Sequence, residues 1–134
     1  MANNFQIESY QVYVTQGRTD FNRSIKLTSP DLSHGIRVRA SVFFQDSNLF
    51  QKWKGVGKIT NVGGENFDGS DIQVVCNPSL FDGFYQVLSS EKPVYLSYVY
   101  ENWPEEPKGT TKLITQVTLK TDTEMPGDYE SMIK

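Results

Sequence analysis

The sequence predicts a mainly β protein, either an antiparallel β-sandwich or a partly open β-barrel of about seven strands. The first observation is a period of two. Between residues 36 and 45, the side chains of Val38, Ala40, Val42 and Phe44 fall on one face of an extended chain. The second is that turns rich in Gly, Pro and Asp separate several segments of this kind. The third is that a single longer segment, residues 77–90, has a helical period instead.

The strands follow one another at short intervals. The segment 94–100 is β-branched and aromatic and is apolar on both faces, which is typical of a central strand. A short helical turn is expected at residues 47–54. We expect strands at residues 10–14, 24–28, 36–45, 58–62, 71–76, 94–100 and 113–119.

The helix is expected from Asn77 to Ser90. Asn77 is a good N-cap residue, and proline is common at the position that follows the cap. Apolar residues then repeat at helical spacing, with Phe84 as the expected main anchor. Gly83 weakens the helix, so we expect another part of the chain to pack closely against the backbone there.

The order of elements from residue 36 onward is β-β-β-α-β-β, the order of OB-type barrels. The first two strands would then be an N-terminal addition. We expect residues 1–120 to form one domain and residues 121–134 to be a mobile polar tail. OB-type barrels bind nucleic acids, sugars or proteins, so this order alone selects no function.

The composition limits the setting of the protein. Cys76 is the only cysteine, so no internal disulfide can form, and its apolar strand context predicts a buried thiol. The first residues do not resemble a secretory signal, and no apolar run approaches the length of a membrane span. We therefore expect a cytoplasmic protein without a membrane span.

The glycine- and lysine-rich stretch 52–64, KWKGVGKITNVGG, is not a phosphate loop. Lys52 stands where the first glycine of a Walker loop belongs, and Ile59 stands where its serine or threonine belongs. The glycines are better explained by a bent strand that follows a short helical turn. One histidine, His34, and one cysteine cannot supply a closed zinc site. We expect no metal and no other cofactor.

Enzymatic chemistry is the weakest of the functional alternatives. The candidates are carboxylate pairs, either Glu101 with Glu105 and Glu106, or Asp68 with Asp71. Two carboxylates can catalyse glycoside hydrolysis, but sequence spacing does not give the separation that this mechanism requires. We therefore assign no catalytic residue, and we expect the protein not to be an enzyme.

The leading hypothesis is a non-catalytic recognition module that binds a protein or a carbohydrate. An aromatic strand runs out into a loop at Asn102 and Trp103, and aromatic surfaces of this kind stack on sugars or anchor protein partners. Self-association through the strand 94–100 is a further alternative. The expected ligand-binding residues are Trp103, Tyr98, Tyr100, Asn102 and Trp53.

The main alternative is an OB-like protein that binds single-stranded nucleic acid. Cationic side chains interleave with Phe50 and Trp53, and a single-strand groove combines stacking rings with cations in this way. The sequence pI of about 5.1 and the net charge of −3 disfavour it. The expected nucleic-acid-binding residues are Arg37, Arg39, Lys52, Lys54 and Lys58.

Overall fold

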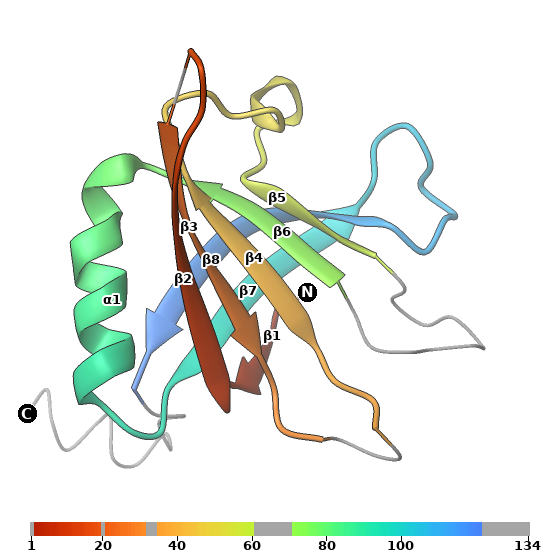
Figure 1. Ribbon diagram of the computed structural model, residues 1–134. Coiled ribbons are helices and arrows are strands. Elements are labelled where there is room, and N and C mark those ends of the chain that lie inside the picture. The colour runs from red at the N-terminus through yellow and green to blue at the C-terminus, as the bar shows by residue number, and fades with distance from the viewer. Residues whose placement is uncertain (1, 20, 32–34, 61–70, 122–134) are drawn as a thin grey trace, which may run out of the picture.

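The computed structural model describes residues 2–19, 21–31, 35–60 and 71–121. Its strands form one curled sheet in the order β1-β7-β8-β5-β6-β4-β3-β2, which confirms the predicted mainly β, partly open barrel (Figure 1). All neighbouring strands are antiparallel except the pair β4 and β6. The strands are β1 (Ala2–Gln6), β2 (Ser9–Gln16), β3 (Phe21–Thr28), β4 (Arg39–Phe44), β5 (Gly57–Thr60), β6 (Asp71–Cys76), β7 (Tyr95–Asn102) and β8 (Lys112–Lys120).

The junction between β1 and β2 draws the two ends of the sheet together. These strands lie at opposite ends of the sheet order, yet only Ile7 and Glu8 separate them in the chain. The Ile7 N–H donates to the Val94 carbonyl at 2.8 Å, and the Glu8 N–H donates to the Thr28 carbonyl at 2.8 Å. Because one short junction bonds to both ends, the sheet must curl into a barrel that stays open along part of its length.

Strand β1 is an element that the sequence pattern missed. Its residues, ANNFQ, contain Phe5 as the one large apolar side chain, so they show no alternation. The strand forms because it pairs antiparallel with β7 and buries Phe5, which is 7% exposed. Long-range pairing therefore outweighs the weak strand preference of the two asparagines.

Strand β7 is central, as expected. It pairs with β1 on one side and with β8 on the other, with a register irregularity between Val99 and Tyr100. Self-association through the edge of this strand is therefore wrong as an expectation, because β1 occupies that edge.

The pairing of β4 is not consecutive. After β4 the chain crosses over and returns as β5, which lies between β8 and β6, and β6 then pairs in parallel with β4. The β-β-β-α-β-β order along the chain is as predicted, but the neighbours of each strand are not those of a simple meander. The crossover carries the short η1 (Gln51–Trp53), inside the predicted helical turn.

The helical segment begins and ends where the sequence predicted. It consists of η2 (Pro78–Leu80) and α1 (Phe81–Ser90), and the Asn77 side chain accepts a hydrogen bond from the Ser79 N–H at 2.9 Å. Helix α1 packs beside the sheet and contributes Leu88, 5% exposed, to the interior (Figure 1). The expected close contact at Gly83 is wrong, since a Cβ there would meet no atom within 4 Å.

The inner core is the apolar cluster between the inner face of the sheet and α1. Phe44 packs against the helix, with its ring centroid 5.2 Å from that of Phe81 and 5.3 Å from that of Phe84 in edge-to-face geometry. Phe84 is half-buried, so it shares the anchoring role with Leu88. The buried members are Phe5, Ile25, Leu27, Val38, Ala40, Val42, Phe44, Ile59, Ile72, Val74, Cys76, Leu88, Val94, Leu96, Tyr98, Tyr100 and Ile114.

Candidate functional site

The crossover between β4 and β5 is a compact turn held by one asparagine. The Asn48 Oδ1 accepts from the Phe50 N–H at 2.9 Å, and its Nδ2 donates to the Gly55 carbonyl at 3.0 Å. Lys54 ends η1 with a φ of 59°, in the left-handed region. These bonds fix the direction of the side chains in η1, which begins the candidate site.

Close packing explains two glycines of this stretch. A Cβ on Gly55 would lie 2.5 Å from the Leu113 Cδ1, and a Cβ on Gly57 would overlap the Gln73 carbonyl oxygen. Gly55 therefore lets the crossover lie against β8, and Gly57 lets the start of β5 lie against β6. This geometry agrees with the bent-strand interpretation of residues 52–60, whereas residues 61–64 lie outside the described part.

The outer cluster lies on the opposite face of the sheet from the inner core. It consists of Phe50, Val75 and Leu113, all buried, with Trp53 and Trp103 half-buried against them. The two indole centroids are 4.6 Å apart and their planes are inclined by 54°. The fold thus brings together the two tryptophans that the sequence singled out, one from the β4–β5 crossover and one from the loop after β7. We call Trp53 and Trp103 the tryptophan pair.

Charged and polar side chains surround the tryptophan pair. The Lys52 Nζ lies 4.2 Å from the Trp53 ring centroid and 3.7 Å from the Glu105 Oε1. The side chains of Lys52 and Glu105 are 66% and 63% exposed. Asn102 is exposed at the end of β7, where its Oδ1 accepts from the Lys112 Nζ at 3.1 Å. The tryptophan pair is therefore an apolar centre with a rim that carries both charge signs.

Tyr98 and Tyr100 do not belong to this surface. Both point to the inner face of β7, where they are 5% and 8% exposed and their rings are 6.1 Å apart. Burial is the main cause that raises the pKa of the Tyr98 phenol, with Tyr100 adding to it. The sequence could not separate the two faces of β7, because apolar residues occur on both. The aromatic surface is therefore narrower than the sequence predicted.

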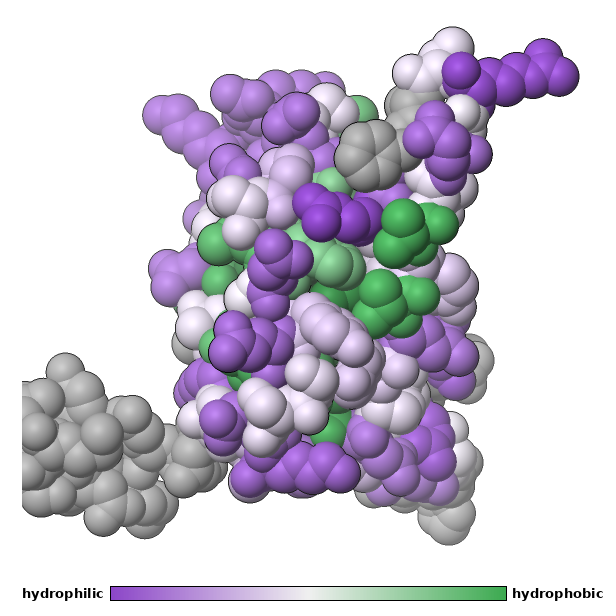
Figure 2. Space-filling view, turned by 60° about the vertical axis from the view of Figure 1, so that its left-hand side comes forward, coloured by the Kyte–Doolittle hydropathy of each residue, from purple (hydrophilic) through white to green (hydrophobic). Residues whose placement is uncertain are grey.

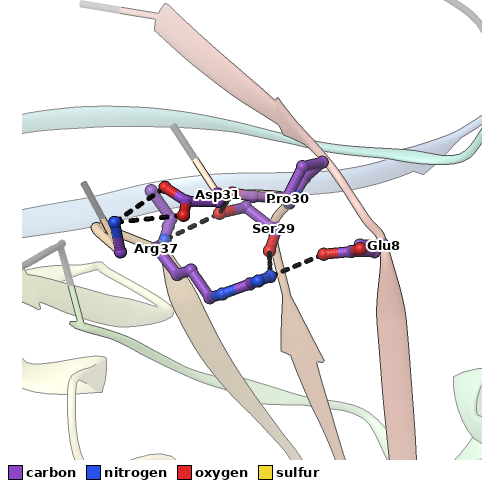
Figure 3. A network of polar contacts seen from close by, with 7 residues as sticks. Glu8, Ser29, Pro30, Asp31 and Arg37 are labelled. Atoms are coloured by element: carbon purple, nitrogen blue, oxygen red, sulfur yellow. Dashed lines mark hydrogen bonds and ion pairs between the residues drawn. The ribbon is translucent and has the colours of Figure 1, made fainter. Parts of the chain in front are cut away.

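Arg37 takes part in a polar network just before β4. Its Nη1 donates both to the Glu8 Oε2 and, at 2.9 Å, to the Ser29 carbonyl (Figure 3). Ser29 is fully buried, and its Oγ accepts from the Val38 N–H at 2.8 Å. This network ties the segment before β4 to the start of β2, so Arg37 has a structural role in the fold.

Arg39 and Lys58 come together on the outer face of the sheet, and Lys26 joins them. The register pairs Lys26 with Ser41, Ser41 with Gln73, and Gln73 with Lys58, so one row crosses four strands. These side chains line a shallow hollow of about 240 Å³, together with Arg39, Thr60, Asp71 and Ile72. Sequence reasoning missed Lys26, because only the strand pairing places it beside the other two cations.

An apolar row runs next to this basic hollow. The register pairs Tyr13 with Ser24, Ser24 with Phe43, and Phe43 with Val75 of the outer cluster. Tyr13 is 47% exposed and Phe43 is half-buried. Lys52, in η1, and Lys54, directly after it, do not line the hollow. The outer face therefore combines aromatic rings with Lys26, Arg39 and Lys58.

A second, wider hollow of about 840 Å³ lies beside the β1–β2 junction. Ile7, Tyr10, Leu88 and Val94 give it apolar walls, and Glu91 and Lys92 are among its charged residues. No local sequence pattern indicates this hollow, because its walls come from segments that lie far apart in the chain.

The titratable groups of the described residues do not indicate a catalytic site. Burial raises the pKa of the Cys76 thiol to about 11, which keeps it protonated near neutral pH, as expected for a buried thiol. Glu101, Glu105 and Glu106 are exposed, and Asp68 and His34 lie outside the described residues. Among the residues that the structure describes, no group of three His, Cys, Asp or Glu side chains could hold a metal ion.

Comparison with known proteins adds no family assignment. No protein-family model matches the chain, and no curated protein or solved structure matches it significantly. In the described part of the chain, no helix has the length and apolar character needed to cross a membrane. Any function must therefore be argued from the surface itself.

Proposed function

We propose that this chain is a non-catalytic recognition module that binds a protein partner through the tryptophan pair and its charged rim. The observation that carries the proposal is the convergence of Trp53 and Trp103, from separate loops, at 4.6 Å on the outer face. Tryptophan is enriched among the residues that dominate protein–protein binding energy. Lys52 and Glu105 would orient the partner and favour one that places a negative charge near Lys52 and a positive charge near Glu105.

A protein partner is favoured over a carbohydrate by the shape of the pair. A sugar stacks on an open, flat aromatic face, whereas the Lys52 ammonium already lies over the Trp53 ring. Because the indole planes are inclined by 54°, the pair also does not present one flat platform. Tilted aromatic side chains of this kind can instead pack against apolar groups of another protein.

The test begins with covalent mapping. A photo-crosslinking residue is placed at position 52 on the rim or at position 82 on the exposed face of α1, and the chain is irradiated in an extract of its source. We expect a partner that crosslinks from position 52 and not from position 82. Equal crosslinking from both positions would contradict the proposed surface.

Affinity for the purified partner then tests the rim. Lys52→Glu and Glu105→Lys reverse exposed charges, so neither should unfold the chain. We expect each to weaken binding by about 3- to 10-fold, mainly through the association rate. Asp82→Lys is the matched control, because it reverses one exposed charge on α1, and it should leave affinity unchanged. Equal affinity of all four proteins would refute a role for the rim.

A second candidate function, single-stranded nucleic-acid binding, is favoured by the outer-face rows. Lys26, Arg39 and Lys58 would follow the phosphates, while Tyr13 and Phe43 would stack on bases. Asp71 lies in the same hollow and opposes this binding, as does the net charge of −3. We therefore rank it below protein recognition.

Salt dependence tests this candidate. With three phosphate contacts, the logarithm of the association constant should fall with the logarithm of salt concentration with a slope of about −2. Arg39→Ala should lower that slope in magnitude, whereas Lys108→Ala, at an exposed position in the loop after β7, should leave it unchanged. Absence of oligonucleotide binding at low salt would exclude the candidate.

A further inference from the structure

Strand β2 is an edge of the sheet that lacks the usual protections. Its outer side pairs with no strand in the described part of the chain, and its sequence, SYQVYVTQ, contains neither charge nor proline. Natural edge strands usually carry lysine, proline or an inward charge, or are very short, because an open edge pairs with other chains. The other edge, β1, is protected by its length of five residues, whereas β2 has eight.

Strand β2 exposes apolar side chains on the inner face of the sheet, the face that carries the inner core. Val12 and Val14 are 37% and 70% exposed, although Ile25, the cross-strand neighbour of Val12, is fully buried. On the outer face Tyr13 is 47% exposed. Hydrophobic side chains reach the surface on this side of the molecule, among the hydrophilic ones (Figure 2). A strand added to this edge would cover apolar surface on both faces.

We propose that β2 pairs antiparallel with β2 of a second copy of this chain, around a two-fold axis through Tyr13. A two-fold interface uses the same patch on both copies, so the patch must be complementary to itself. An uncharged strand meets this condition, because no like charges face each other within it. The pairing must also keep inner-face residues opposite inner-face residues, since side chains alternate along a strand.

Charge complementarity selects the register. With Tyr13 opposite its own counterpart, Val12 of one copy faces Val14 of the other, so the apolar inner face continues across the axis. The same register brings Glu8, just before the strand, near Arg18 of the second copy, just after it, and symmetry repeats this pair. Arg18 is exposed, and Arg37 uses one of the two Glu8 carboxylate oxygens. Shifts by two residues either way lose the Glu8–Arg18 pairs.

The dimer would extend one sheet through both copies and leave the tryptophan pair of each accessible, since those residues lie beyond β5 and β6 in the sheet order. The proposal therefore stands apart from the proposed function. The competing occupant of the β2 edge is an extended segment of another protein. If the purified chain is monomeric, that alternative is favoured over the dimer.

Disulfide mapping tests the register. Cys76 is buried, so an introduced cysteine is the reactive one. Tyr13→Cys should form an intermolecular disulfide readily, because the two Cα atoms would lie about 5 Å apart. Gln11→Cys alone should not, since its two copies would be about 13 Å apart. A mixture of Gln11→Cys and Thr15→Cys should crosslink, because these positions face each other.

Sedimentation of the unmodified chain provides the second test. We expect a monomer–dimer equilibrium in the unmodified chain, and we expect Val14→Lys to shift it to monomer. Arg18→Glu should lower the dimer association constant several-fold, because it would place the new carboxylate beside that of Glu8 in the second copy. Val14 is 70% exposed, so Val14→Lys should keep the fold, which circular dichroism checks. A chain that remains monomeric at high concentration would overturn the proposal. So would a dimer that persists in Val14→Lys and does not crosslink through Tyr13→Cys.

Discussion

The inner core and the outer cluster lie on the two faces of one sheet, but only the inner core is closed. Helix α1 covers the inner core, and many side chains of this core are fully buried. In the outer cluster, Phe50, Val75 and Leu113 are covered by two tryptophans that are only half-buried. Buried apolar area determines stability, whereas exposed aromatic area is available for binding. The two clusters should therefore respond differently to the same kind of substitution.

Adjacent phenylalanines on β4 provide the largest expected effect. Phe44 is 3% exposed between Phe81 and Phe84, so Phe44→Ala should lower the free energy of unfolding by about 3–5 kcal/mol. Phe43 faces outward and is half-buried, so Phe43→Ala should cost clearly less. Urea denaturation of both variants measures the difference. Equal losses of unfolding free energy in the two variants would contradict the distinction between a closed inner face and an open outer face.

The glycines of the crossover should give the next largest effects. An added Cβ at position 57 meets the rigid backbone of β6, whereas at position 55 it first meets the movable side chain of Leu113. Gly57→Ala should therefore destabilise by about 1–3 kcal/mol or more, and Gly55→Ala by less. The midpoints of urea denaturation compare the two variants, and the reverse ranking would contradict the packing described for β5.

Gly83 should respond in the opposite direction. It lies exposed within α1, and a Cβ there meets no other atom within 4 Å. Gly83→Ala should stabilise the protein by up to about 1 kcal/mol, because alanine favours the helix more than glycine does. Thermal unfolding measures this increase. A loss of stability would show that α1 packs more closely than the structure indicates.

The buried thiol gives the smallest effect near neutral pH. Its pKa is raised from 9.0 to about 11 in the folded state, so the unfolded state loses its proton first. Stability from the neutral thiol is present below pH 9 and is lost as the pH rises toward 11. Cys76→Ala should therefore show a shallower alkaline loss of stability in denaturation curves collected across this range. The same dependence of stability on pH in the unmodified chain and in Cys76→Ala would show that the thiol is not buried in the core.

The sequence predicted the elements that depend on local pattern. The strand at 71–76 and the helical segment after Asn77 lie within the predicted bounds, because alternation and capping are local properties. Strand β1 and the parallel pairing of β4 with β6 depend on distant residues, so no local pattern indicates them.

The candidate site was predictable only in part. The sequence named Trp53 and Trp103, yet their contact depends on the crossover that brings η1 over β8. It also named Tyr98 and Tyr100, which face inward, and Arg37, whose guanidinium is held by Glu8 and Ser29. Lys26 was missed because its proximity to Arg39 follows from strand register alone.

Tryptophan emission during partner titration tests the central claim most directly. The two tryptophans form the proposed binding surface and are the only ones in the chain, so emission reports on that surface. We expect the partner identified by crosslinking to shift the emission in the unmodified chain, in Trp53→Phe and in Trp103→Phe, while a glycan panel leaves it unchanged. Unchanged emission at saturating partner concentration would show that binding occurs elsewhere and would contradict the account.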